Sequence, residues 1–351
     1  MNENQAAGAG PADATQGRRW VGWVAVWILF AAVAAIALVT GKYAISPQDI
    51  ARVILARLTG TASGVPATVE TVVWNVRLPR VLCGLVAGAA LSAAGAVYQG
   101  LFRNPLVSPD ILGVSAGASL GAVLGIFLSL PVIAIQGLSF AGGLAAVALV
   151  YAIGALARGR DPTLVLVLAG IAVGALLGSC ISLLKVLADP YNQLPAITFW
   201  LLGSLASVSR GDFLSVLPAM VLGLVPMVLL RWRMNLMTLE DEEARALGVE
   251  TARTRLVLIA ASTLMTSAAV SISGIIGWIG LLIPHIARAL VGPDFSKLLP
   301  ASLILGGCYL TLMDTLARSA SVEIPLGILT AAVGAPFFLW LLLMTSRRGW
   351  N

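Results

Sequence analysis

The chain contains one histidine, His285, which directly follows Pro284 in an apolar run and precedes Arg288 by three residues. An imidazole can serve as a general acid, a general base or a metal ligand, but each role needs other residues placed around it. No second histidine, paired cysteine or catalytic partner accompanies it in the sequence. We therefore interpret His285 as a hydrogen-bonding residue near a helix end, or as a contact to a partner protein.

The other residues with chemical potential also stand alone. Cys83, Cys180 and Cys308 lie singly in apolar runs, a pattern that predicts neither a disulfide framework nor a metal site. The sequence shows no glycine-rich phosphate-binding loop and no nucleophile paired with a base, so we expect no enzymatic activity. Asp314 is the main carboxylate within an apolar run, and Arg318 follows four residues later. A structural ion pair explains this spacing as well as a proton relay does.

The composition indicates which elements position these residues. Of the 351 residues, 59% are hydrophobic and 11% are charged, with a mean hydropathy of +0.95. A bilayer core needs roughly 20 apolar residues per helix, so we predict an all-α polytopic membrane protein with about ten helical segments. The apolar windows are 20–40, 81–102, 109–130, 132–157, 163–187, 211–230, 256–276, 278–291, 298–317 and 325–344.

Two apolar stretches are too short to cross a bilayer. Residues 278–291 are expected to be broken by Pro284, and residues 194–207 form an additional short stretch. Irregular backbone survives in a membrane only where protein or a water-filled cavity surrounds it. The short segments therefore point to a lined pathway.

The charges indicate the topology. Residues 1–19 are small and polar and predict a disordered cytoplasmic tail, followed by one transmembrane domain over 20–351 with an uncleaved first span. With the N-terminus inside, fourteen of the 22 Lys and Arg fall on the cytoplasmic side, as the positive-inside rule requires. The eight others are Lys42, Arg52, Arg57, Arg77, Arg80, Lys185, Arg210 and Arg318. The net charge of +6 thus reflects topology, and nucleic acid is not needed to explain it.

Two segments suggest an internal repeat. Residues 90–105 and 269–284 share the pattern A-x-S-x-x-G with a proline ten residues after the glycine, and they are expected to run in opposite directions. This is typical of inverted-topology repeats, in which broken helices from two halves meet at a central pathway. The abundance of small residues in membrane helices explains the similarity equally well.

One long hydrophilic stretch, residues 231–255, lies between apolar segments. Leu239, Ala244 and Leu247 recur among acidic residues and Gly248 follows, which predicts a short amphipathic helix with a glycine cap. Such a helix on the cytoplasmic face can dock in a partner's groove. A solvated connection between two spans is the alternative.

Three long motifs carry a family resemblance over about residues 20–345. They are residues 77–119, "GWIGLLIPHIARALVGPDFSKLLP" (277–300) and "EIPLGILTAAVGAPFFLWLLL" (323–343). In this order they resemble the FecCD/BtuC-like permeases, the type II ABC importers of ferric siderophores, haem and cobalamin. The resemblance implies a bacterial inner-membrane protein with both termini cytoplasmic. It also implies a homodimer or pseudodimer of ten-helix permeases, two cytoplasmic ATP-binding subunits and one periplasmic substrate-binding protein.

The resemblance further implies roles for individual residues. The connection at about 239–253 corresponds to the family's coupling helices, whose E-A-x-x-L-G element matches Glu243, Ala244, Arg245, Leu247 and Gly248. The family's arginines that engage the binding protein correspond to Arg77, Arg80 and Arg318. Guanidinium groups suit carboxylates, although anchoring at the membrane interface is the alternative for these three.

The gate of the pathway is also implied by the resemblance. Family members close the cytoplasmic end with two segments, which correspond here to Asn104, Pro105 and Leu106 and to Thr198, Gly203 and Ser204. Asn104 is expected to cap the next helical segment and to project into the pathway. Gly203 is expected to permit close helix approach.

We therefore expect ATP-driven alternating access that moves an iron chelate, either haem or a ferric siderophore, with cobalamin as a further alternative. ATP and Mg would reside on the partner ATPase, and this chain would bind no cofactor. An ion-coupled secondary transporter and an intramembrane enzyme are the other classes considered. ATP dependence in the presence of a cytoplasmic partner separates the first class from both others.

Overall fold

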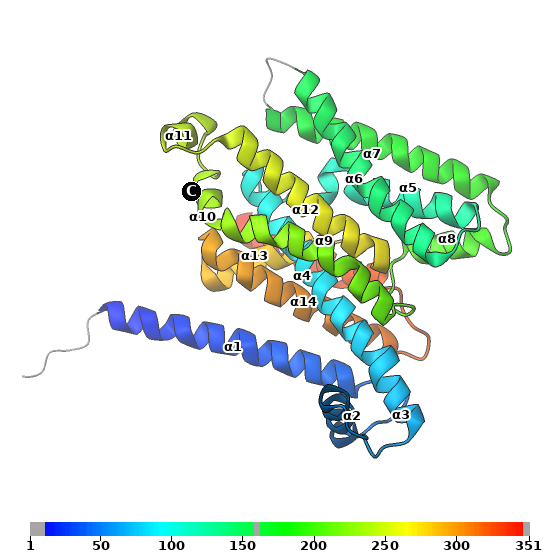
Figure 1. Ribbon diagram of the computed structural model, residues 1–351. Coiled ribbons are helices and arrows are strands. Elements are labelled where there is room, and N and C mark those ends of the chain that lie inside the picture. Colours follow the sequence, from blue (N-terminus) through cyan, green and yellow to red (C-terminus); the bar gives the residue numbers. More distant parts are fainter. Residues whose placement is uncertain (1–10, 158–161, 347–351) are drawn as a thin grey trace, which may run out of the picture.

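The computed structural model describes residues 11–157 and 162–346, and the regular structure in these residues is helical (Figure 1). Ten apolar helices form the body: α1 (Pro11–Val39), α4 (Leu78–Leu101), α5 (Val114–Phe127), α6 (Val132–Leu156), α7 (Pro162–Leu187), α9 (Arg210–Leu229), α12 (Thr251–Ser273), α13 (Ile279–Val291), α14 (Phe295–Ser319) and α15 (Leu326–Ser346). Within the described residues, six helices are long and apolar enough to cross a membrane, and four others carry shorter apolar stretches. The expected all-α architecture with about ten membrane helices is confirmed.

Helix α4 runs through the centre of the bundle and packs against α12, α13 and α14. In its apolar window 78% of the residues are buried, against 22% in α6, so α6 is peripheral. Small residues permit the close packing. A Cβ on Gly88 would stand 2.2 Å from the carbonyl oxygen of Gly306, and one on Gly95 would stand 1.9 Å from that of Gly280. Only glycine fits at these two contacts between backbones.

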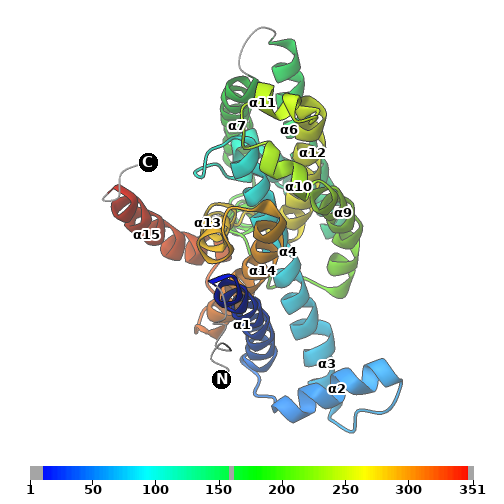
Figure 2. The ribbon, with the colours of Figure 1, turned by 90° about the vertical axis from the view of Figure 1, so that its left-hand side faces the viewer.

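Helix α4 belongs to a longer helix than the apolar window 81–102 indicates. Helix α3 (Ala67–Thr71) and the π-helical segment η1 (Val72–Arg77) lead into it, which gives one helix of 35 residues. Pro79 explains the wide π-helical turn, because proline lacks an N–H and its ring crowds the carbonyl four residues earlier. Together with α2 (Pro47–Thr59), this extension projects from the bundle (Figures 1 and 2).

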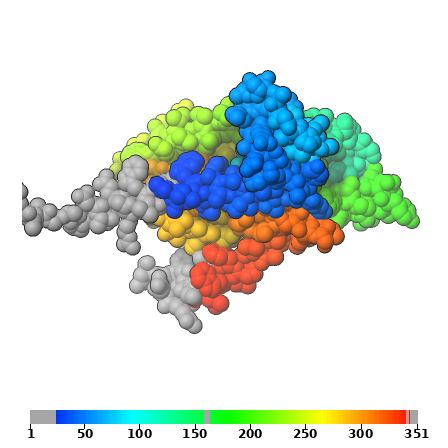
Figure 3. All heavy atoms as spheres, turned by 90° about the horizontal axis from the view of Figure 1, so that it is seen from below, coloured from blue at the N-terminus to red at the C-terminus, as the bar shows by residue number. Residues whose placement is uncertain are grey.

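The helices run between two ends of the molecule. Helices α10 (Arg231–Leu236) and α11 (Asp241–Ala246) lie at one end beside the start of α12, which we call the α11 end (Figure 1). Helix α8 (Gln193–Leu201) and the end of α12 lie at the other, the α8 end. Figure 2 views the molecule from the α11 end. Helix α1 starts on the side of this same end (Figure 1), and α15 runs toward it (Figure 3).

Two expectations about local structure need correction. Helix α1 starts at Pro11, so residues 11–19 are helical and not part of a disordered tail, while residues 1–10 lie outside the described residues. Proline suits a first helical turn because its missing N–H would have no partner there. In addition, α13 continues through Pro284. The break lies upstream at 274–278, which Gly274 and Trp278 bound with φ angles of 67° and 72°.

Candidate functional site

The hydrophilic connection contains a capped helix, α11. The N–H of Gly248, whose φ is 84°, donates to the carbonyl of Arg245 at 2.9 Å. The N–H of Val249 donates to the carbonyl of Ala244 at 3.0 Å. These two bonds form a Schellman cap, and the buried side chains of Ala244 and Val249 supply its hydrophobic contact. The opposite face is open, with Leu247 58% exposed, so α11 presents an apolar side chain at the surface.

Asp241, the first residue of α11, joins three parts of the chain. Its Oδ1 accepts from Nη2 of Arg103, just after α4, at 2.8 Å, and from Nη2 of Arg255, near the start of α12, at 3.0 Å. The Arg255 side chain is 8% exposed and that of Arg103 is 35% exposed, so the pair with Arg255 is the less solvated one. Sequence reasoning missed Asp241, because an acidic residue in a first helical turn is common and carries little signal.

The predicted gate residues Asn104, Pro105 and Leu106 follow Arg103 in a tight turn. Arg103 has a φ of 49°, and the side-chain Oδ1 of Asn104 accepts from the N–H of Leu106 at 2.9 Å. Asn104 therefore closes this turn. The expectation that it caps the next helix is wrong. Asn104 and Pro105 border a cavity of about 600 Å³ at the α11 end, together with Asn235 of α10. Their role as a gate stays a prediction.

The histidine lies on α13, which a polar contact fixes to α4. Because Pro284 has no N–H, the carbonyl of Gly280 lacks its helical donor. The side-chain amide of Gln99 donates to that carbonyl at 3.2 Å, and its Oε1 accepts from Nη2 of Arg288 at 2.6 Å. The half-buried side chain of His285 takes part in none of the hydrogen bonds found among the described residues. Within those residues, no group of three or more His, Cys, Asp and Glu could hold a metal ion.

Asn235 attaches α10 to the start of α14. Its side-chain amide donates to Oδ1 of Asp294 at 2.9 Å, and its carbonyl oxygen accepts from the N–H of Phe295 at 2.7 Å. The hydrogen bond from Asn235 is the main cause that lowers the pKa of the Asp294 carboxyl, and the N–H of Ser296 adds to it. A carboxyl with a lowered pKa stabilises the fold above its unfolded pKa, and this contribution is lost as the pH falls through the folded pKa.

Residues Thr198, Gly203 and Ser204 form part of a junction at the α8 end. Thr198 donates its hydroxyl to a carbonyl within α8 at 2.8 Å. Gly203 has a φ of 72°, and a Cβ there would stand 2.4 Å from the carbonyl oxygen of Ile275. The N–H of Ser204 donates to the carbonyl of Ser273, the last residue of α12, at 2.8 Å. The expected close approach at Gly203 is therefore present.

This location corrects the expectation that both gate segments close the same end of the pathway. Residues 198–204 contact the end of α12, whereas the loop after α4 is joined through Asp241 to Arg255 near its start. Helix α12 has 23 residues, and at 1.5 Å per residue it spans roughly 35 Å. The two segments thus lie at opposite ends of the bundle.

The arginines expected to dock a binding protein are engaged within the chain. Arg77 donates from Nη1 to the carbonyls of Leu38 and Val39, each at 2.7 Å, and from Nη2 to the carbonyl of Tyr43. Its exposed fraction is 3%. Arg77 is the last residue of the π-helical segment η1, and its guanidinium contacts the end of α1.

Arg80 and Arg318 belong to a buried ionic cluster. Arg80 donates from Nε to Oδ2 of Asp314 at 2.9 Å, from Nη2 to Oδ1 at 2.8 Å, and also to Glu323. Nε of Arg318 lies 3.7 Å from Oδ2 of Asp314, and its Nη2 donates to the carbonyl of Ala37. The expected pair of Asp314 and Arg318 is present, but Arg80 is the closer partner of this carboxylate.

The docking role of these three arginines stays a prediction, but their guanidinium groups are not free at the surface. Arg77, Arg80 and Arg318 are each less than 9% exposed. Their guanidinium groups form hydrogen bonds with carbonyls and carboxylates of the chain instead of with water. The three arginines line a cavity of about 250 Å³ with Lys42 and Glu323. Only a group that enters this cavity would reach them.

Comparison with known proteins identifies the family. The sequence matches the FecCD transport family over residues 28–344. The chain belongs to this family. The cobalamin import system permease protein BtuC of Halobacterium salinarum is 44% identical, over 80% of this chain and 75% of its own length. The molybdate import system permease protein MolB of Haemophilus influenzae is 38% identical, over 92% of this chain and 96% of its own length. A similar solved structure is an ABC transporter assigned to the metal-chelate type, in an inward-facing conformation. It is 36% identical with a TM-score of 0.82, and the match covers 92% of this chain and 98% of that chain.

As a FecCD permease, the chain is a non-catalytic subunit of an ABC importer and a multi-pass membrane protein, which confirms the resemblance of the sequence motifs. The cargoes in the names of its relatives differ, so the family defines the role of the chain but does not identify its cargo.

The segments 90–105 and 269–284 meet where Gly95 packs on Gly280. The first is helical up to Leu101, while the second contains the break between α12 and α13. Their origin as an inverted repeat stays a prediction.

Proposed function

We propose that this FecCD permease imports a metal chelate, with an iron chelate such as haem or a ferric siderophore as the first candidate. The similarity to the metal-chelate type transporter supports this proposal, because it extends over 98% of that chain at a TM-score of 0.82. Cobalamin, a cobalt chelate, is the second candidate, since the BtuC relative is 44% identical. Molybdate, which the name of the MolB relative specifies, is a small oxyanion and the chemically distinct third candidate.

We further propose that two partner subunits, which hydrolyse ATP, bind at the α11 end. Leu247 and Arg245 are exposed there, while the buried Ala244 and the Schellman cap fix the helix to the permease. An amphipathic helix of this form suits a groove on an ATPase subunit. Through Asp241, a movement of that subunit would reach both α12 and the loop after α4.

The proposal further orients the α11 end toward the cytoplasm and the α8 end toward the periplasm, in a bacterial inner membrane. A second copy of the chain would complete the pathway, and a substrate-binding protein would dock at the α8 end. Arg52 and Arg57 of α2 form ion pairs with Asp49 and Glu70, but their side chains are 62% and 50% exposed and remain accessible to its carboxylates. Arg77, Arg80 and Arg318 would take part only through the cavity that they line.

Transport would proceed by alternating access, with one gate at each end of the bundle. Residues 104–106 border the cavity at the α11 end, and residues 198–204 lie at the α8 end. Alternating access requires two gates that are never open together. Separate locations for the two segments suit this requirement better than a shared location would.

Reconstitution into proteoliposomes with the partner ATPase and binding protein tests the proposal. Haem, a ferric siderophore, cobalamin and molybdate are offered in parallel, with and without ATP. We expect ATP-dependent accumulation of one chelate. Accumulation of molybdate alone would refute the chelate assignment, and uptake that a proton or sodium gradient drives without ATP would refute the importer itself.

A further inference from the structure

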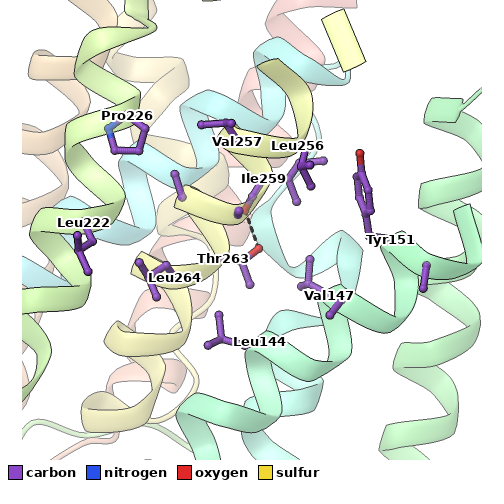
Figure 4. A pocket seen from close by; sticks show the side chains of 14 residues that line it. Leu144, Val147, Tyr151, Leu222, Pro226, Leu256, Val257, Ile259, Thr263 and Leu264 are labelled. Atoms are coloured by element: carbon purple, nitrogen blue, oxygen red, sulfur yellow. Dashed lines mark hydrogen bonds between the residues drawn. The ribbon is translucent and has the colours of Figure 1, made fainter. Parts of the chain in front are cut away.

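An open groove runs along the bundle between α6 and α9, with α12 as its floor (Figure 4). Its volume is about 670 Å³. The walls are almost wholly apolar and include Leu144 and Val147 from α6, Leu222 and Pro226 from α9, and Leu264 from α12. Only 22% of the apolar window of α6 and 28% of that of α9 are buried, so both walls belong to peripheral membrane helices. This lateral groove is therefore placed to accept hydrocarbon.

A smaller polar pocket lies beside the lateral groove at the α11 end. Its volume is about 250 Å³, and it includes the polar side chains of Asp241, Arg245, Thr251 and Arg255. Tyr151 lines both the pocket and the lateral groove. Leu256, which lines the groove, directly follows Arg255 in the chain. The apolar groove thus adjoins a basic pocket at the level where the membrane helices end.

The basic pocket carries more positive charge than its carboxylate balances. Asp241 forms ion pairs with Arg255 and also with Arg103, which lies outside the pocket. Arg245 donates from Nε to Oγ1 of Thr251 at 3.3 Å and forms no ion pair with a carboxylate of the described residues. The Nε of Arg255 is buried and has no hydrogen-bond acceptor within that same part of the chain. An anion with several oxygens would satisfy both arginines.

We propose that the lateral groove and the basic pocket together bind one anionic phospholipid, with its acyl chains in the groove and its phosphate at Arg245 and Arg255. Basic pockets between membrane helices at a cytoplasmic surface are suited to such headgroups. A free phosphate would fit the pocket but leave the groove without an occupant. A zwitterionic lipid such as phosphatidylcholine would fit the groove, but its choline ammonium would place a positive charge beside Arg245 and Arg255 and offset the charge of its phosphate. The bound lipid would lie against α11, the helix that we propose contacts the ATPase.

Native mass spectrometry of the purified full-length permease tests this proposal, with phosphatidylglycerol and phosphatidylcholine offered at equal concentrations. We expect one phosphatidylglycerol per chain to be retained with about tenfold preference, because its net negative charge meets two guanidinium groups. Arg245→Gln should remove the preference. Arg253→Gln is the matched control and should keep it, because that side chain is 79% exposed and lies outside the pocket. Equal retention of the two lipids would overturn the proposal.

Filling the lateral groove tests its apolar half without a change of charge. Ala148→Trp places an indole in the groove, and Ala145→Trp places the same indole on α6 at an exposed position outside it. Only the first variant should lose retained phosphatidylglycerol, by about tenfold. Equal loss in both variants would contradict the assignment. If Arg245→Gln weakens capture of the ATPase subunit but leaves lipid retention unchanged, the pocket serves a protein partner and the lipid proposal is wrong.

Discussion

Removing the charge of Arg80 tests the buried ionic cluster at the α8 end. The guanidinium of Arg80 in α4 holds both carboxylate oxygens of Asp314 in α14, at 2.9 and 2.8 Å, and also contacts Glu323. The Asp314 side chain is 2% exposed and that of Glu323 is 29% exposed. Arg80→Met therefore leaves mainly Asp314 without its partner. Arg318, at 3.7 Å from that carboxylate, compensates only in part.

The expected magnitude follows from the burial of Asp314. Removing one partner of a buried ion pair costs about 3–5 kcal/mol, because the remaining charge stays desolvated. The attraction of Arg318 favours the lower bound, about 3 kcal/mol. Since about 1.4 kcal/mol corresponds to a factor of ten, an opening that separates α4 from α14 should become about a hundredfold more frequent.

The chain supplies its own probes for this opening. Cys83 in α4 and Cys308 in α14 are free and buried, so their rate of reaction with a thiol reagent reports openings that expose the buried faces of these helices. Cys180 is replaced by serine in all variants. The double variant Arg80→Met/Asp314→Asn removes both charges and should react within about tenfold of the wild-type rate. A single variant that reacts less than about threefold faster, or a double variant as reactive as the single one, would refute the reasoning.

Three further predictions concern the α11 end and the core. Asp241→Asn keeps the shape of the side chain but weakens its bonds to two arginines, so ATP-driven uptake should fall about tenfold while ATP hydrolysis persists; unchanged uptake would exclude a coupling role. Gly248→Pro cannot adopt the native φ of 84°, so it should uncouple ATP hydrolysis from uptake in a permease that still folds, as size-exclusion chromatography would show. Gly95→Ala places a Cβ 1.9 Å from the Gly280 carbonyl and should lower stability by about 1–3 kcal/mol in thermal unfolding, whereas Gly137→Ala meets nothing within 4 Å and should not.

The membrane segments were predictable because the bilayer constrains each helix separately. The windows 132–157 and 163–187 differ from α6 and α7 by one residue at one end. The start of the central helix was missed because residues 67–77 carry a weaker apolar signal than residues 81–102. Length and hydropathy thus locate a helix within the bilayer but not its extension beyond it.

The partners of the charged residues could not be predicted in the same way. The glycine cap at Gly248 was predicted because both of its hydrogen bonds are local. By contrast, Arg103 lies 138 residues from Asp241, and Arg80 lies 234 residues from Asp314. Spacing along the chain detects only pairs on one helix. It therefore indicated the pair of Asp314 with Arg318 and missed the stronger contact with Arg80.

Helix α12 explains how a movement at α11 can affect both ends of the permease. Its start is held by Arg255 on Asp241, and its end by the hydrogen bond from Ser204 to Ser273. A packed helix does not shorten, so a displacement of its start must move its end or tilt the helix against α4. The non-helical residues 274–278 separate α12 from α13, so the end of α12 can move together with Ser204 without carrying α13 with it. A rigid helix that is joined at each end to one of the two predicted gate segments, through Asp241 at its start and through Ser204 at its end, would link them as the proposed alternating access requires.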